Sequence, residues 1–137
     1  MSAGSPDSTL ESVVENLHVF ESDDRVSAYD AKGGLTPAEA LLVDRWVPRG
    51  GRVLDLGMGT GRTYPALSAR CEVYVGVDYA GAMVAAATQA YPDGDFRVGD
   101  ASDLSDFDDE SFDTVVFSYN GLDYLQPFEA RERTLAE

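Results

Sequence analysis

Glycines recur at alternate positions in one short segment, Asp55-Leu56-Gly57-Met58-Gly59-Thr60-Gly61. An apolar strand is predicted before it, over residues 52–56, and a helix after it, over residues 60–69. Glycine lets the chain turn sharply and lets the backbone approach a ligand closely. The free N–H groups of such a turn and of the following helix can receive an anion. The segment therefore predicts a ligand-binding turn, and a purely structural tight turn is the alternative.

Two acidic residues follow at the ends of the next two predicted strands. Asp78 closes the strand over 73–77, where a carboxylate can accept from both hydroxyls of a ribose. A turn or helix cap is the alternative role. Asp100 follows the strand over 96–98 and can accept from an exocyclic amine such as that of adenine. Alternatively, Asp100 is simply one acidic residue of the run 100–113, with no role in binding. This run is a predicted solvated loop, and the spacing of its acidic residues does not match a calcium-binding loop.

A fourth feature is the apolar strand predicted over residues 114–117, which runs directly into Ser118, Tyr119 and Asn120. An ordinary loop would also be polar here. However, all four features fall at the carboxyl ends of successive strands, which meet at one edge of a parallel sheet. Together they predict one crevice that holds a nucleotide-like ligand, with the last group of side chains facing the reacting centre.

The alternation of strands and helices from residue 52 onward predicts an α/β fold, a Rossmann-like doubly wound parallel sheet of about four strands. A last helix is expected to open at Pro127. Before the sheet we expect a disordered tail over 1–8 and a helical cap over 9–49. The cap contains an amphipathic helix over 9–20, an irregular stretch over 21–35, and a helix from the capping box Thr36–Glu39 to Trp46. Residues 50–137 form the ligand-binding domain.

Composition excludes several classes of function. The 137 residues include 25 acidic and 10 basic side chains, a formal net charge of −15, with Lys32 as the only lysine. Nucleic acids and anionic membranes require clustered basic residues, so neither is an expected partner. Cys71 and His18 are each the only residue of their type, which argues against disulfides and against a resident metal. Without a signal-like or spanning apolar segment, a cytoplasmic protein is expected, either an ordinary acidic one or one adapted to high salt.

Two common nucleotide folds do not match the glycine turn. A dinucleotide fold requires a third glycine three residues after the second, at the position that Arg62 occupies. A P-loop requires a lysine beside the turn, and Lys32 is far from it in the sequence. An NAD-linked oxidoreductase is therefore a lesser alternative.

The chain resembles the class I S-adenosylmethionine (SAM)-dependent methyltransferases. Residues 53–61 look like their glycine motif, Val75-Gly76-Val77-Asp78 with Met83 like their second motif, and segments 99–101 and 112–115 like their third and fourth. The resemblance implies that the glycine turn cradles the methionine part of SAM, with Asp55 supporting it. It implies cofactor contacts from Asp55, Gly57, Met58, Gly59, Gly61, Asp78, Tyr79, Met83, Asp100, Ala101, Ser118 and Tyr29. Core packing is the alternative role for Met83 and for Tyr29.

The function implied is methyl transfer from SAM to a small-molecule or unidentified acceptor. The methyl group of a sulfonium is already activated, so transfer needs alignment and a dry site more than acid–base groups. Tyr119, Asn120 and Asp123 are the catalytic candidates. The segment 118–121 lacks the Asn/Asp-Pro-Pro-aromatic tetrapeptide of DNA amino-methylating enzymes, which disfavours a DNA acceptor.

One departure from the family is the number of strands, about four here against the usual seven. The fourth strand would expose an apolar edge over residues 115–117, a predicted association site that suits a homodimer. A C-terminally truncated chain is the favoured explanation. A half-domain completed by a partner chain and a degenerate protein are the others. The alternative function is a non-catalytic module that binds SAM or another nucleotide and works by association.

Overall fold

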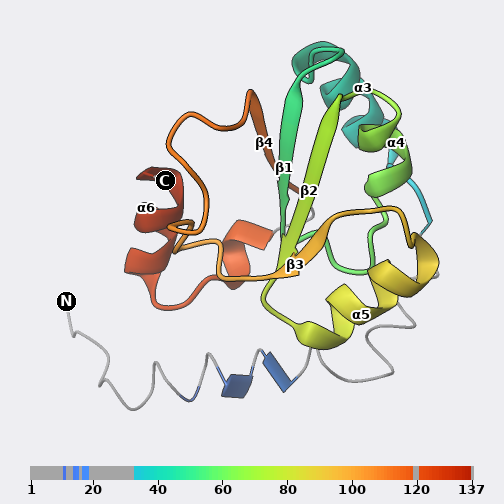
Figure 1. Cartoon of the computed structure of the whole chain (residues 1–137). Coiled ribbons are helices and arrows are strands. Elements are labelled where there is room, and N and C mark those ends of the chain that lie inside the picture. Colours follow the sequence, from blue (N-terminus) through green and yellow to red (C-terminus); the bar gives the residue numbers. More distant parts are fainter. Residues whose placement is uncertain (1–10, 12–13, 16, 19–32, 119–120, 137) are drawn as a thin grey trace.

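The computed structural model describes residues 11, 14–15, 17–18, 33–118 and 121–136 (Figure 1). Four parallel strands form one sheet in the order β3-β2-β1-β4. Their bounds are β1 Arg52–Leu56, β2 Val73–Asp78, β3 Phe96–Val98 and β4 Thr114–Phe117. Each predicted strand is present, and the α/β, Rossmann-like class is confirmed. The first strand lies inside the sheet, so the chain crosses over it between β3 and β4.

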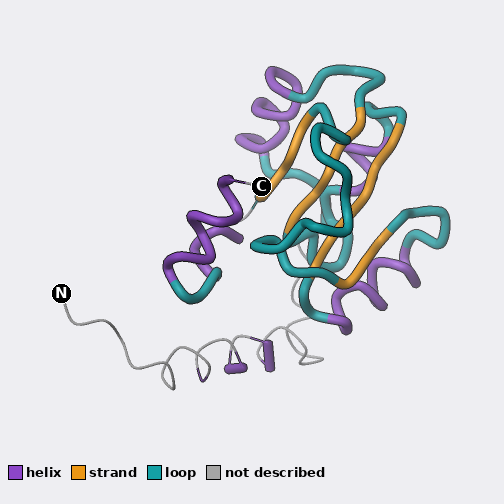
Figure 2. The backbone as a smooth tube through the Cα atoms, turned by 60° about the vertical axis from the view of Figure 1, so that its left-hand side comes forward, coloured by secondary structure: helices purple, strands orange, loops and turns teal. Residues whose placement is uncertain are grey.

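Helices lie on both sides of the sheet. On one side, α3 (Pro37–Trp46), α4 (Tyr64–Ser68) and α5 (Gly81–Ala90) follow one another, and on the other lie the short helix η1 (Gly121–Tyr124) and α6 (Phe128–Ala136) (Figure 1). Figure 2 shows the strands side by side, with loops passing over one face. Two helical layers around a parallel sheet give the doubly wound arrangement predicted from the alternation.

The two central strands bury both of their faces. Leu54 and Leu56 pair in register with Val75 and Val77 and form the core on the α6 side. Val53 packs on the opposite face in a core made with Val47, Leu67 and Tyr74. Continuous apolar runs are typical of strands that are covered on both faces. This core fixes the carboxyl ends of β1 and β2, where the predicted site residues stand.

The helix predicted over 60–69 is shorter than expected and begins at Tyr64. Gly61 has φ +83°, in the left-handed region, so residues 60–63 form turns instead of a first helical turn. The glycine turn therefore continues through residues 60–63, where the sequence pattern predicted the first turn of a helix.

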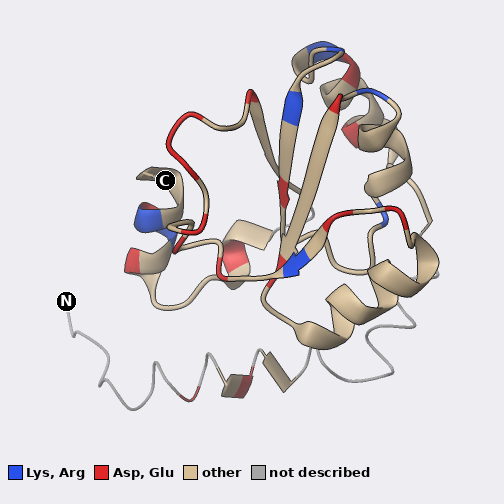
Figure 3. Cartoon of the chain, in the orientation of Figure 1, with Lys and Arg blue, Asp and Glu red and all other residues tan. Residues whose placement is uncertain are grey.

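The connection between β3 and β4 also differs from the predicted alternation, because residues 99–113 contain no helix. Leu104, Phe107 and Phe112 of this loop pack against the core on the α6 side. Its acidic side chains are grouped along the loop (Figure 3). The predicted solvated loop exposes its acidic side chains, and it also covers the sheet with three apolar side chains.

The cap in front of the sheet is described from residue 33, and residues 11, 14–15 and 17–18 are helical. The tail 1–8, most of the segments 9–20 and 21–35, and Tyr29 lie outside the described residues. The predicted capping box is present in α3, where the Glu39 N–H donates to Thr36 Oγ1 at 3.2 Å and the Thr36 N–H donates to Glu39 Oε2 at 2.7 Å. Such reciprocal bonds satisfy donors at the start of a helix.

β4 forms the outer edge of the sheet. It pairs with β1, and within the described part of the chain no strand lies on its other side. Val115 on this edge has 56% of its surface exposed. None of the helices described is long and apolar enough to cross a membrane.

Candidate functional site

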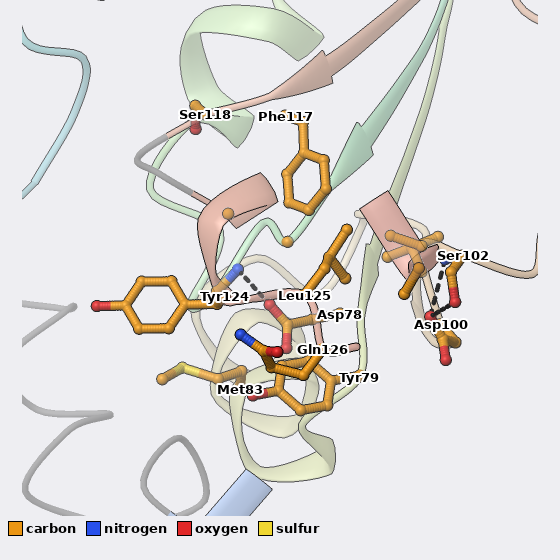
Figure 4. A pocket seen from close by; sticks show the side chains of 17 residues that line it. Asp78, Tyr79, Met83, Asp100, Ser102, Phe117, Ser118, Tyr124, Leu125 and Gln126 are labelled. Carbon is orange, nitrogen blue, oxygen red and sulfur yellow. Dashed lines mark hydrogen bonds between the residues drawn. The ribbon is translucent and has the colours of Figure 1, made fainter. Parts of the chain in front are cut away.

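A cavity opens at the carboxyl ends of the strands, between β2 and β4 (Figure 4). Its walls come from the glycine turn, β2 and the residues after it, α5, the start of the β3–β4 loop, and the segment from the end of β4 to α6. The lining residues are Gly57, Gly59, Val77, Asp78, Tyr79, Met83, Gly99, Asp100, Ala101, Ser102, Phe117, Ser118, Gly121, Tyr124, Leu125, Gln126 and Ala130. The crevice predicted from strand order is therefore present.

The glycine turn requires glycine for two distinct reasons. Gly57 and Gly59 have φ values of +60° and +58°, which other residues rarely adopt. A Cβ on Gly57 would lie 2.7 Å from Cε2 of Phe117, inside contact distance. At Gly61, a Cβ would meet Tyr91 Cδ2 at 3.2 Å, so that glycine serves close packing against α5. The turn thus brings bare backbone to the cavity wall.

Asp78 stands at the end of β2 and is buried at the floor of the cavity. Its Oδ2 accepts from the Gly59 N–H at 2.9 Å, and its Oδ1 accepts from the Ala80 N–H at 2.9 Å. Burial raises the pKa of the Asp78 carboxyl, and the two backbone N–H groups oppose that rise. Each carboxylate oxygen has further lone pairs, so Asp78 can fix the turn and still accept from a ligand.

Asp55 lies behind the turn, fully buried, and does not line the cavity. Its Oδ2 accepts from the Thr63 hydroxyl and from the Tyr74 hydroxyl, the latter at 2.8 Å. Its Oδ1 is buried and has no hydrogen-bond partner among the described residues. Burial raises the pKa of Asp55 to about 6. Asp55 and Thr63 bracket the glycine turn, so their contact closes the turn at its base.

We expect Asp55→Asn to flatten the pH dependence of folding stability. Between pH 7 and 4 the folded chain takes up a proton at Asp55 that the unfolded chain, with a pKa near 3.8, does not. Wild type should therefore gain stability relative to the variant as the pH falls, on the order of 2 kcal/mol. Urea unfolding across this range measures the difference. The exposed Asp109→Asn is the matched control, and an equal slope in the two variants would contradict the expectation.

Arg62, considered in the sequence only as the residue that breaks a dinucleotide motif, is buried and ion-paired. Its Nη2 donates to Glu39 Oε1 at 2.7 Å, and its Nη1 donates to Glu39 Oε2 at 2.8 Å and to the Gly34 carbonyl at 2.7 Å. The guanidinium lowers the pKa of Glu39 to about 2. Glu39 therefore has two roles: it caps α3, and it pairs with Arg62, the residue that follows the glycine turn.

Asp100 follows β3 at the rim of the cavity. Its Oδ1 accepts from the backbone N–H and the hydroxyl of Ser102, each at 2.8 Å (Figure 4). These bonds hold the carboxyl group in place and leave Oδ2 without a hydrogen bond to Ser102. The adjacent Ala101 is buried and also lines the cavity.

The structure brings most of the predicted site residues to one cavity. Those that line it are Gly57, Gly59, Asp78, Tyr79, Met83, Asp100, Ala101 and Ser118. Asp55, Met58 and Gly61 are not among the lining residues, and neither is the exposed Asp123. Tyr29, Tyr119 and Asn120 lie outside the described residues.

Several lining residues were not anticipated. Phe117 ends β4 and forms a wall between Gly57 and Gly121, and its apolar strand position was the one signal available. Tyr124 is the last residue of η1, and Leu125 and Gln126 follow it before α6; all three line the cavity (Figure 4). No local sequence pattern marks that segment as part of the site.

Comparison with solved structures shows the same fold in SAM-dependent methyltransferases. A SAM-bound amino pentose methyltransferase from Micromonospora echinaspora superimposes with a TM-score of 0.66 at 28% identity, over 80% of this chain and 48% of that one. A TehB-like SAM-dependent methyltransferase from Corynebacterium glutamicum gives a TM-score of 0.62 at 32% identity, over 82% of this chain and 60% of that one.

Among curated proteins, a phosphatidylethanolamine N-methyltransferase from Cereibacter sphaeroides is 45% identical over 74 residues, which cover 50% of this chain and 36% of that protein. A demethylmenaquinone methyltransferase from Clavibacter sepedonicus is 36% identical over 90 residues, 63% of this chain and 36% of that protein. The chain therefore spans little more than a third of the length of these relatives. A family model described as a methyltransferase domain matches residues 53–137. With its glycine turn and acidic strand ends in place, the chain belongs to the SAM-dependent methyltransferase family.

Proposed function

We propose that the chain binds SAM and forms the cofactor-binding part of an enzyme that methylates a small-molecule acceptor. The observation that carries the proposal is the position of Asp78. Its carboxylate lines the cavity, and each oxygen uses one lone pair on a backbone N–H and keeps another for a ligand. Two such oxygens suit the two neighbouring hydroxyls of a ribose.

The rest of the cavity fits the other parts of SAM. The bare backbone at Gly57 and Gly59 suits the methionine part, in the place where a side chain would collide with Phe117. Asp100 and Ala101 at the rim suit the polar edge of adenine, and the apolar Met83 suits its face. Tyr79, which follows Asp78, completes the proposed cofactor contacts.

SAM, when bound, supplies a methyl group that its sulfonium already activates. The protein then has to align the acceptor and exclude water. Phe117 and Leu125 form an apolar wall that keeps water out, and we assign Ser118, at the end of β4, to the side of the reacting centre. Tyr119, Asn120 and Asp123 remain candidates for orienting the acceptor. No Lys or Arg is found among the described residues that line the cavity, which disfavours acceptors bound through phosphate.

Titration calorimetry of the purified chain with SAM, its demethylated product S-adenosylhomocysteine, and NAD tests the proposal. We expect saturable binding of the first two and none of NAD. Binding of NAD without binding of SAM would overturn the assignment and favour an oxidoreductase. Transfer of labelled methyl from SAM to amine-bearing and hydroxyl-bearing acceptors then tests catalysis.

The open edge of β4 favours one alternative, a module that binds SAM and acts by association, as a homodimer or with a partner chain. Val115 is exposed on that edge, and parallel edges of this kind pair readily with another strand. SAM binding without turnover, together with a dimer in light scattering, would favour the module. We also propose a cytoplasmic location, supported by the free thiol of Cys71, which cell fractionation tests.

A further inference from the structure

We propose that Arg62 and Glu39 are a positioning pair that holds the glycine turn in its ligand-binding conformation and couples it to the start of α3. Arg62 is the residue directly after Gly61, and Glu39 lies in the first turn of α3. The two side chains meet through a two-pronged contact of 2.7 and 2.8 Å. Their exposed fractions are only 6% and 17%, so solvent screens the pair weakly.

The pair belongs to a chain of contacts that starts outside the cavity. Glu39 Oε2 accepts from the Thr36 N–H as well as from Arg62, and Arg62 also reaches the Gly34 carbonyl. The residue after Arg62 is Thr63, whose hydroxyl donates to Asp55. At the other side of the turn, Asp78 accepts from the Gly59 N–H. Three acidic side chains therefore hold the turn, and Glu39 is the one supplied by α3.

Helix α3 has no fully buried residue between Pro37 and Trp46; Val43 packs against the core, and an arginine holds each end of the helix. Arg62 holds the amino end, and Arg70 holds the carboxyl end by donating to Asp44 Oδ1 at 3.1 Å and to the Val47 carbonyl. The second contact does not touch the glycine turn. The chain thus contains a matched pair of anchors on one helix, only one of which bears on the cavity.

A buried ion pair is a poor source of net stability, because removing two charges from water offsets most of their attraction. Its geometry is nevertheless specific, since a planar guanidinium and a carboxylate meet in one plane. Arg62 and Glu39 are therefore better suited to fix the position of the turn than to hold the chain folded. This inference rests on the proposed function wherever SAM is the probe. Because coupling between two sites is reciprocal, a pair that supports SAM binding implies that bound SAM stabilises the start of α3.

Hydrogen exchange in the ligand-free chain tests the pair without reference to SAM. The Gly59 amide donates to Asp78 Oδ2 and the Gly61 amide donates to the Met58 carbonyl, and in Arg62→Met we expect both to exchange at least about tenfold faster than in wild type. The control Arg70→Met removes the arginine of the other anchor, which is 15% exposed and bonds the carboxyl end of α3, and should leave these amides unchanged. Equal exchange in the two variants would overturn the proposal.

SAM calorimetry provides the second measurement. Arg62→Met should weaken SAM binding roughly tenfold, and wild type but not the variant should show slower exchange at Thr36 and Glu39 when SAM is added. If wild type itself does not bind SAM, the proposed function fails while the ligand-free exchange still decides the role of the pair.

The double variant E39Q/R62M separates positioning from simple stability. The introduced glutamine keeps an acceptor for the Thr36 N–H, and the Glu39 carboxylate is no longer left opposite a neutral side chain as in Arg62→Met, so the unfolding midpoint should move back toward that of wild type. We expect SAM binding to stay about tenfold weaker. If the double variant binds SAM with the wild-type affinity, the pair has a purely structural role and the proposal is overturned. If the unfolding midpoint of the double variant does not recover, the hydrogen-exchange comparison of the single variants decides the role of the pair.

Discussion

Asp78→Asn is expected to weaken SAM binding about 100-fold. The variant replaces one carboxylate oxygen by an NH2 group, which faces a backbone N–H from Gly59 or Ala80 and cannot accept from a hydroxyl. A hydrogen bond to a charged group contributes about 1.5–3 kcal/mol, and about 1.4 kcal/mol is a factor of ten in affinity. Losing one such bond outright, and the charge on the oxygen that makes the other, therefore corresponds to roughly two orders of magnitude, which calorimetry with SAM measures directly.

Asp109→Asn is the matched control for charge, because Asp109 is exposed on the β3–β4 loop. It should bind SAM as wild type does. Thermal unfolding of both variants distinguishes a lost ligand contact from a lost fold. An affinity of Asp78→Asn within threefold of wild type would contradict the placement of the ribose, whatever the stability of the variant.

The second large effect is expected at Gly57. Gly57→Ala forces a φ of +60° on a residue with a Cβ and places that Cβ 2.7 Å from the Phe117 ring. The strain and the overlap together should lower the free energy of unfolding by roughly 2–4 kcal/mol. If the ring moves to relieve the overlap, the cavity wall that it forms moves with it. SAM affinity should therefore fall more than about tenfold, as calorimetry at a temperature below the unfolding midpoint will show.

Gly50→Ala isolates the backbone contribution. Gly50 has φ +80°, and a Cβ there would meet no atom of the described residues within 4 Å. This variant should lose only about 1 kcal/mol of stability and bind SAM normally. Similar losses of stability and of affinity in the two variants would mean that strain alone, and not the contact with Phe117, accounts for the glycine at position 57.

The strand pattern was predictable because the two inner strands bury both faces, which leaves a continuous apolar run in the sequence. β1 was predicted with the bounds that the structure has, and β2 extends one residue further, to Asp78. The carboxyl ends of parallel strands share one edge, so the meeting of Asp78 and Asp100 at one cavity followed from their order alone. The capping box of α3 was equally local and equally visible.

What could not be predicted depends on contacts between distant residues. Arg62 looked like a defect in a motif until its partner, Glu39, was seen beside it, 23 residues earlier in the chain. Leu104 and Phe107 lie in a strongly acidic run, yet they cover the sheet in place of a helix. Gln126 reaches the cavity only because η1 turns the chain back. In each case tertiary packing determines which residues come into contact, and no periodic pattern in the local sequence reveals it.

The strand order also has a consequence for the sequence of events in folding. β1, β2 and β3 are joined by short crossovers, whereas β4 pairs with β1 over a long sequence separation, as in the pair Val53 and Thr114. Closing a longer loop costs more entropy before any contact rewards it, and such pairings form late. During synthesis, the glycine turn and Asp78 can therefore be in place while Phe117 and Leu125 are still missing. We expect a nascent chain to acquire the polar floor of the cavity first and the wall that encloses a ligand last.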